Sequence, residues 1–204
     1  MKKNINCLCG TNLQIEYEET IDLDTDNESL DKIFNGTFLS QKCSFCGKMH
    51  KPEFKITIVW KSKDLKMEVY PELDRGEFYK NKKENPSIES IIGYPEMADR
   101  LAVIKDDLEP VVIETLKSFL LGKAAEAYPD NEINAWYHCK GANGIEFHLD
   151  GIRPDEVAVM RIPMEMYENT LEDYKKRPKN ETYASLRVRS YLSVQNLLRP
   201  DALK

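Results

Sequence analysis

The sequence predicts an α+β fold: an N-terminal ribbon of antiparallel strands with a helical extension, followed by a small antiparallel sheet that carries one or two helices. Three observations support this prediction. Apolar residues alternate in the first 60 residues, recur at helical spacing between residues 97 and 120, and alternate again after residue 134. We expect two regions, residues 1–127 and residues 128–204.

Length and composition are those of an ordinary globular protein. The chain has 204 residues, of which 41% are hydrophobic and 31% charged, and its net charge is −6. This acidic balance disfavours a dominant nucleic-acid surface. Two lysines near Met1 have no apolar stretch behind them, and no run approaches the ~18 apolar residues of a membrane span. We therefore expect a cytoplasmic protein with no membrane partner.

Four of the five cysteines form two close pairs. One pair is Cys7 and Cys9, the other is Cys43 and Cys46, and each is followed directly by glycine. In a zinc knuckle such a glycine permits the positive φ of a tight turn, which aims two thiolates at one metal ion. Two knuckles supply the four thiolates of a structural site that leaves no position for substrate. We therefore expect these cysteines to bind one structural Zn²⁺.

Two alternatives concern the same segment. The thiols could be unliganded or redox-active, but a thioredoxin-like site needs one CxxC pair near a βαβ unit rather than two separated pairs. His50, four residues after Cys46, could replace one ligand. Because four cysteines are available, we expect His50 to be a surface residue.

Each cysteine pair is followed by a strand pattern, as in a zinc ribbon. Apolar residues alternate from Leu13 to Tyr17 and again from Phe54 to Ile58. The gap between the pairs is longer than the ~15–20 residues that are usual for a paired site. A short helix over residues 27–36, capped at Asp26 or Asn27, would account for it.

These features together resemble the CpXC family, a bacterial and archaeal domain named for two Cys-Pro-x-Cys knuckles. The resemblance covers about residues 5–125 and includes the helix that follows Asp106 and Asp107. This chain lacks both prolines and has a shorter first knuckle. The resemblance implies four cysteine ligands, which map onto the four paired cysteines, and it implies no reaction.

The remaining elements follow from periodicity and turn signals. Residues 72–94 are charged and interrupted by glycine and proline, so we expect a loop or linker there. Two helical stripes follow, and we expect Asp106 or Asp107 to cap the second, with Pro110 in its first turn. We also expect strands at 65–70, 135–140, 145–149 and 156–162, a helix at 163–174, and mixed strand and helix at 181–198.

The sequence contains no recognisable catalytic template, whether a phosphate-binding glycine loop or a zinc-protease motif. The Asn143-Gly144 hairpin would place Cys139 and His148 on one sheet face, directly opposite or diagonal, with Glu146 and Tyr137. A thiol beside an imidazole could be an activated nucleophile, but a free cysteine in a strand is commonly a small core residue. We assign no catalytic residue.

Three functions remain open. We expect a zinc-stabilised module that binds another protein. A nucleic-acid-binding zinc ribbon is the first alternative, since residues 42–66 hold seven lysines together with Phe45, Phe54 and Trp60. That ribbon contains no arginine, and residues 16–31 hold eight acidic residues and no basic one, which disfavours it. The second alternative is an enzyme of unknown type with a site near Cys139 and His148.

Overall fold

The computed structural model describes residues 1–80 and 88–198. Helices and strands both contribute substantially, which confirms the predicted α+β class. Contacts within the chain define two compact units, Met1–Ala98 and Asp99–Lys204. The division into domains at residues 127 and 128 stays a prediction. No helix in the described part of the chain has the length and apolar character needed to cross a bilayer.

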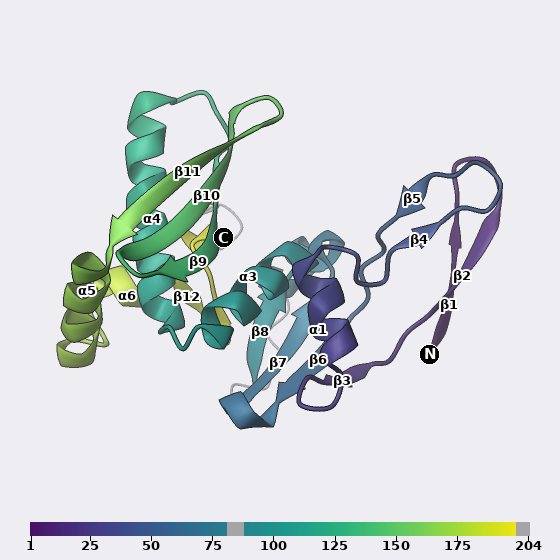
Figure 1. Ribbon diagram of the computed structural model, residues 1–204, viewed down its shortest axis with the longest axis horizontal. Helices are drawn as coiled ribbons and strands as arrows, with labels where there is room; N and C mark the ends of the chain where they lie inside the picture. Colours follow the sequence, from purple (N-terminus) through teal and green to yellow (C-terminus); the bar gives the residue numbers. More distant parts are fainter. Residues whose placement is uncertain (81–87, 199–204) are drawn as a thin grey trace. The chain divides into compact units, whose positions relative to one another are not determined.

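Two antiparallel hairpins belong to the first unit. Strand β1 (Lys2–Asn6) pairs with β2 (Asn12–Glu16), and β4 (Gln41–Lys42) pairs with β5 (Met49–His50). Buried and exposed residues alternate along β2, as the sequence predicts. The two hairpins lie side by side with their turns at the same end (Figure 1).

A short helix, α1 (Asn27–Phe34), occupies the insert between the hairpins. Its N-cap is Asp26, whose side chain accepts a hydrogen bond of 2.9 Å from the Ser29 N–H. Ile33 is buried, and the chain turns away after the helix at Gly36, which has a φ of +69°. The helix accounts for the long spacing between the cysteine pairs, as predicted.

The first unit also contains strands that follow the order β8-β7-β6-β3. Their bounds are β3 (Thr20–Asp22), β6 (Ile56–Trp60), β7 (Leu65–Tyr70) and β8 (Glu89–Ile92). Strands β6 and β7 are antiparallel and joined through the 3₁₀ helix η1 (Lys61–Lys63), whereas β3 with β6 and β7 with β8 are parallel. Parallel neighbours need long connections, and α1 and the second hairpin lie in the one between β3 and β6.

The prediction of a loop or linker over residues 72–94 is wrong for the residues that the structure describes. This segment contains the 3₁₀ helix η2 (Glu72–Asp74), helix α2 (Arg75–Lys80) and strand β8. Arg75 is buried, and its guanidinium donates to Glu72 Oε1 at 2.6 Å and to Glu96 Oε1 at 2.5 Å. These carboxylates give the buried guanidinium the partners that a buried charge needs. Residues 81–87 lie outside the described residues.

The second unit contains an antiparallel sheet of order β11-β10-β9. Its strands, β9 (Asn134–Gly141), β10 (Gly144–Arg153) and β11 (Glu156–Pro163), confirm the three predicted strands. The remaining elements of the C-terminal half are α3 (Tyr94–Lys105), α4 (Pro110–Ala127), α5 (Met164–Lys176), α6 (Glu181–Ala184), β12 (Arg187–Val188), β13 (Tyr191–Leu192) and α7 (Gln195–Leu198). The predicted mixture of strand and helix after residue 181 is confirmed.

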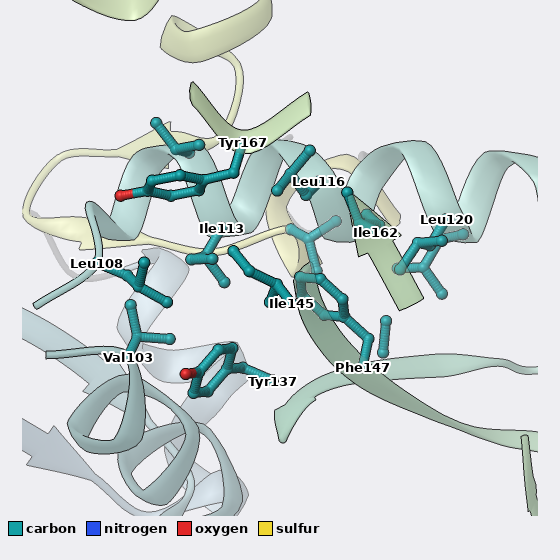
Figure 2. Close-up of a cluster of buried hydrophobic side chains, with 14 of the residues drawn as sticks. Val103, Leu108, Ile113, Leu116, Leu120, Tyr137, Ile145, Phe147, Ile162 and Tyr167 are labelled. Carbon is teal, nitrogen blue, oxygen red and sulfur yellow. The ribbon is translucent and has the colours of Figure 1, made fainter. Parts of the chain in front are cut away.

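The core of this unit lies between helix α4 and one face of the sheet (Figure 2). Ile113, Leu116 and Leu120 of the helix face Ile145 and Phe147 of β10, and all five are at most 5% exposed. Successive side chains of a strand point to opposite faces of the sheet, so the residues of β10 next to Phe147, Glu146 and His148, point away from this core. The sheet therefore has a second face that carries polar side chains.

The predicted aspartate cap of helix α4 is wrong. The helix begins at Pro110 with Glu109 as N-cap, and no side chain caps it. Asp107 instead has a φ of +54°, and Asp106 accepts a hydrogen bond from the Tyr137 hydroxyl. The Glu109 N–H donates to the Tyr167 hydroxyl at 2.9 Å, so a tertiary contact satisfies one backbone donor at this helix end.

Four charged side chains form a buried ion network in the second unit: Asp99, Arg100, Glu114 and Lys117, each at most 7% exposed. Lys117 Nζ donates to Glu114 Oε1 at 2.8 Å and also to Asp99. Backbone groups of other segments complete the network. The Tyr137 N–H donates to Asp99 at 2.6 Å, and the Val194 N–H donates to Glu114 at 2.7 Å. Arg100 donates to the Leu192 carbonyl at 2.8 Å. The network thus links α3 and α4 to β9 and to the segment around β13.

Candidate metal centre

The first cysteine pair lies in the turn between β1 and β2. The Cys7 N–H donates to Thr11 O, and the Gly10 N–H donates back to Cys7 O, both at 2.9 Å. Gly10 has a φ of +89°, a conformation that side chains with a Cβ rarely adopt. The glycine therefore closes a tight turn that brings Cys7 and Cys9 to the tip of the hairpin.

The second pair lies in the turn between β4 and β5 and is built in the same way. The Cys43 N–H donates to Lys48 O at 2.8 Å, and the Gly47 N–H donates to Cys43 O at 2.9 Å. Gly47 has a φ of +74°. The bond from the glycine N–H to the carbonyl of the first cysteine reaches back four residues in this turn and three in the first. This difference matches the extra residue between Cys43 and Cys46.

The four sulfur atoms converge from the two hairpins, and all lie within 4.8 Å of one another. Cys7 Sγ is 3.5 Å from Cys46 Sγ, and Cys9 Sγ is 3.7 Å from Cys43 Sγ. A disulfide would bring two sulfurs to about 2.0 Å, so none is formed between these pairs. Thiolates at ~2.3 Å from one zinc ion lie about 3.8 Å apart at the tetrahedral angle. The cluster could therefore hold a metal ion.

One side of the cysteine cluster is buried among apolar side chains, and the other side is exposed to solvent. The first cysteine of each pair is buried, Cys7 at 4% and Cys43 at 1% exposed, whereas Cys9 and Cys46 are exposed. The two buried thiols pack with Leu13, and Ile5 lies against them. This apolar cluster is small, so burial alone gives the two hairpins little cohesion.

Hydrogen bonds to sulfur favour thiolates at two positions. The Cys46 and Phe45 N–H groups lower the pKa of Cys43, although burial opposes them. The hydroxyl and N–H of Thr11 lower the pKa of Cys9 to about 6. At Cys7 the Cys9 N–H lowers the pKa, but burial and the neighbouring thiols outweigh it and raise the value to about 12. A cation among the sulfurs would favour the thiolate of Cys7, which burial and the neighbouring thiols disfavour.

The comparison with known families rests on the same residues. A family model described as "CpXC protein" matches residues 5–117, which is more than half of the chain and includes all four clustered cysteines. The chain belongs to the CpXC family. The resemblance inferred from the knuckles and the helix is thus confirmed.

This CpXC chain also resembles an uncharacterized protein of Treponema pallidum (strain Nichols). The two are 31% identical over 218 residues, which cover 95% of this chain and 97% of that protein. No solved structure matches the chain. The likeness therefore extends well beyond the part matched by the CpXC model and includes the second unit.

His50 of the CpXC protein contacts the cysteine cluster, although the sequence analysis, which weighed it as a replacement ligand, favoured a surface position. Its Nε2 is 3.2 Å from Cys7 Sγ, and its side chain is half-buried rather than on the open surface. The residue lies on β5, the strand that leaves the second turn. The sequence did contain a signal for this contact. His50 follows Lys48, whose carbonyl closes the second turn, by only two residues, so it stays close to the cysteines in that turn.

The structure places Cys139 diagonal to His148 on the face of Glu146, as predicted, but it places Tyr137 differently. Cys139 pairs with Glu146, but the register then shifts, so that Tyr137 pairs with Phe147 and His148 with Trp136. The prediction that Tyr137 shares the face of His148 is wrong, because Tyr137 is buried in the core. His148 lies beside Glu146 instead, with Nε2 3.4 Å from Oε1.

Proposed function

We propose that Cys7, Cys9, Cys43 and Cys46 hold one structural Zn²⁺, and that this CpXC protein is a zinc-stabilised module that binds another protein. The observation that carries the proposal is the convergence of four sulfurs, two from each hairpin, at the spacing of a tetrahedral thiolate site. Four protein ligands leave the ion no open position, so its role is structural. A reducing compartment such as the cytoplasm would keep these thiols available as metal ligands.

Support for a protein partner comes from the two knuckles themselves. Leu8 is 88% exposed between the first two cysteines, and Phe45 is 79% exposed between the second two. Large apolar side chains held in water on a rigid turn favour contact with another protein. A zinc ion that fixes both turns would hold these side chains ready for binding, because little conformational freedom is then lost.

Nucleic acid has less support than a protein partner. Of the three aromatic residues suggested for base stacking, Trp60 is buried and Phe54 stacks on Tyr17, with ring centroids 4.5 Å apart. Lysines of the same arm are engaged in ion pairs, Lys55 with Glu68 at 3.1 Å and Lys61 with Asp22 at 2.8 Å. Groups committed to internal contacts are poorly placed to bind a phosphate backbone.

The double substitution Leu8→Ser and Phe45→Ser tests the protein-binding surface. We expect proteins that co-purify with the full-length chain from its native cells to be lost, while metal content and thermal stability stay unchanged. Quantitative mass spectrometry of the bound fraction is the measurement. Leu73→Ser is the matched control, since Leu73 is 97% exposed in the first unit but lies outside the knuckles. Equal capture by all three proteins would refute this surface.

The His50→Ala substitution tests whether His50 strengthens metal binding by the four cysteines. Because His50 Nε2 approaches Cys7 Sγ, its loss removes a hydrogen bond that disperses the negative charge of the thiolate. We expect metal affinity to fall by roughly 10-fold to 100-fold, measured by competition with a zinc chelator. Lys51→Ala, at the adjacent exposed position, serves as control. An unchanged affinity in His50→Ala would show that the contact does not serve the metal.

A further inference from the structure

A second group of metal-ligating side chains lies in the second unit, on the polar face of its sheet. We call His138, Glu146 and His148 the histidine–glutamate cluster. One ligand atom from each of the three lies within 4.8 Å of the other two. Glu146 Oε1 is 3.4 Å from His148 Nε2 and 3.8 Å from His138 Nε2. The two ring nitrogens thus approach the same carboxylate oxygen.

An irregularity in β9 creates this arrangement. Cys139 pairs with Glu146 and Tyr137 pairs with Phe147, which leaves His138 as an extra residue without a partner in the register. In a regular strand His138 would face the core, because its neighbour Cys139 pairs with the outward-facing Glu146. The extra residue instead allows Tyr137 to be buried while His138 stacks on His148.

The separations suit a transition metal. Nitrogen and oxygen ligands at about 2.0–2.2 Å from a zinc ion lie roughly 3.3–3.6 Å apart at the tetrahedral angle. The contact between Glu146 and His148 has this separation already, and His138 is a few tenths of an ångström farther away. The imidazole rings are stacked with centroids 3.8 Å apart and an interplanar angle of 16°, so they must tilt for their lone pairs to converge. Side-chain exposures of 51% and 31% leave room for that rotation.

Glu146 is held in place from the other side. Its second oxygen, Oε2, accepts a hydrogen bond of 2.9 Å from Arg161 Nη2 on β11. This bond lowers the pKa of the Glu146 carboxyl, which keeps it ionised at neutral pH and able to ligate a cation. The bond orients the carboxylate so that Oε1 faces the two imidazoles. The positive charge of Arg161 also weakens cation binding, so we expect lower affinity than at four thiolates.

We propose that His138, Glu146 and His148 form a second metal site, which binds a divalent transition-metal ion of the kind that imidazole prefers. Two nitrogens and one carboxylate oxygen occupy three positions and leave a further one open to solvent. The site therefore differs in kind from the closed cysteine cluster: a bound ion here keeps an exchangeable water. It is independent of the proposed function, since no cysteine of the cluster takes part.

The test is a calorimetric titration with Zn²⁺ on the full-length, untagged protein that already contains its cysteine-bound ion. We expect one further equivalent to bind. Affinity should fall at least about tenfold in His148→Ala and in His138→Ala, because each removes one of three ligands. Asp150→Asn is the matched control, since Asp150 lies on the same strand two residues from His148. It should bind as the wild type does.

Ring resonances of the wild-type histidines give a measurement that needs no variant. On addition of Zn²⁺, the signals of His138 and His148 should shift together and saturate at one added equivalent, while those of His50 stay unchanged. Absence of a further equivalent in the wild type would overturn the proposal. So would histidine variants that bind as the wild type does, or zinc-induced shifts that spare His138 and His148.

Discussion

Replacing Cys43 with serine is expected to abolish metal binding and to unfold the two N-terminal hairpins. Cys43 is 1% exposed, and the apolar cluster around it contains few side chains, so the ion would supply most of the cohesion between the hairpins. Structural zinc contributes an apparent ~10–16 kcal/mol in small zinc-dependent folds, far more than this cluster can contribute by burial. Loss of one ligand should therefore remove both the metal and the local fold.

Elemental analysis and hydrogen exchange measure the two parts of this expectation. The wild type should contain about one zinc per chain. In Cys43→Ser the amides of residues 2–16 and 41–50 should lose protection, whereas those of β9 and β10 should keep theirs. Cys139→Ser is the control, because Cys139 lies outside the cluster. Full protection of the hairpins in metal-free protein would contradict a structural role for the ion.

Replacing Lys117 with methionine is expected to destabilise the second unit strongly. The ammonium group neutralises Asp99 and Glu114, both of which are buried. Methionine fills a similar volume but leaves Asp99 without its cation, beside Glu114, which keeps only Arg100 at 3.7 Å. Removing one member of a buried ion pair typically costs about 3–5 kcal/mol, so we expect a loss of that order in the free energy of unfolding.

Trp136 provides a local probe for this measurement. In a Trp60→Phe background its fluorescence reports unfolding of the second unit alone, which avoids treating two units as one transition. Lys123→Met is the matched control: Lys123 is exposed on the same helix, and its Nζ contacts the Phe119 ring at 5.1 Å from the centroid. We expect less than about 1 kcal/mol there. Similar effects of the two substitutions would show that the buried ion network contributes little.

Much of the fold could be predicted because its signals are local. The strands of the second sheet follow from alternation around the Asn143-Gly144 turn, and helix α1 follows from Asp26 and its apolar spacing. Strand β8 could not be predicted in this way. Strand β8 is short and lies in a segment rich in charged residues. Its backbone hydrogen bonds come from parallel pairing with β7, which the local sequence does not reveal.

The same contrast applies to the sites. The two cysteine pairs were recognisable because the turn that aims them is encoded within five residues. The histidine–glutamate cluster was not, because alternation alone places His138 on the wrong face and only the extra residue in β9 corrects it. From the sequence alone, Asp99, Glu114 and Lys117 cannot be told from charged residues on the exposed face of a helix. They are buried only because of tertiary packing.

The bonds from Glu114 to the Val194 amide and from Arg100 to the Leu192 carbonyl have a consequence for protein synthesis. Each charged group is synthesised well before its backbone partner, which follows 92 residues later for Arg100 and 80 residues later for Glu114. The second unit therefore cannot complete this network until Val194 has been synthesised. A chain that stops before Leu192 would retain charges with no complete set of partners, and quality-control proteases would encounter it as an unfolded product.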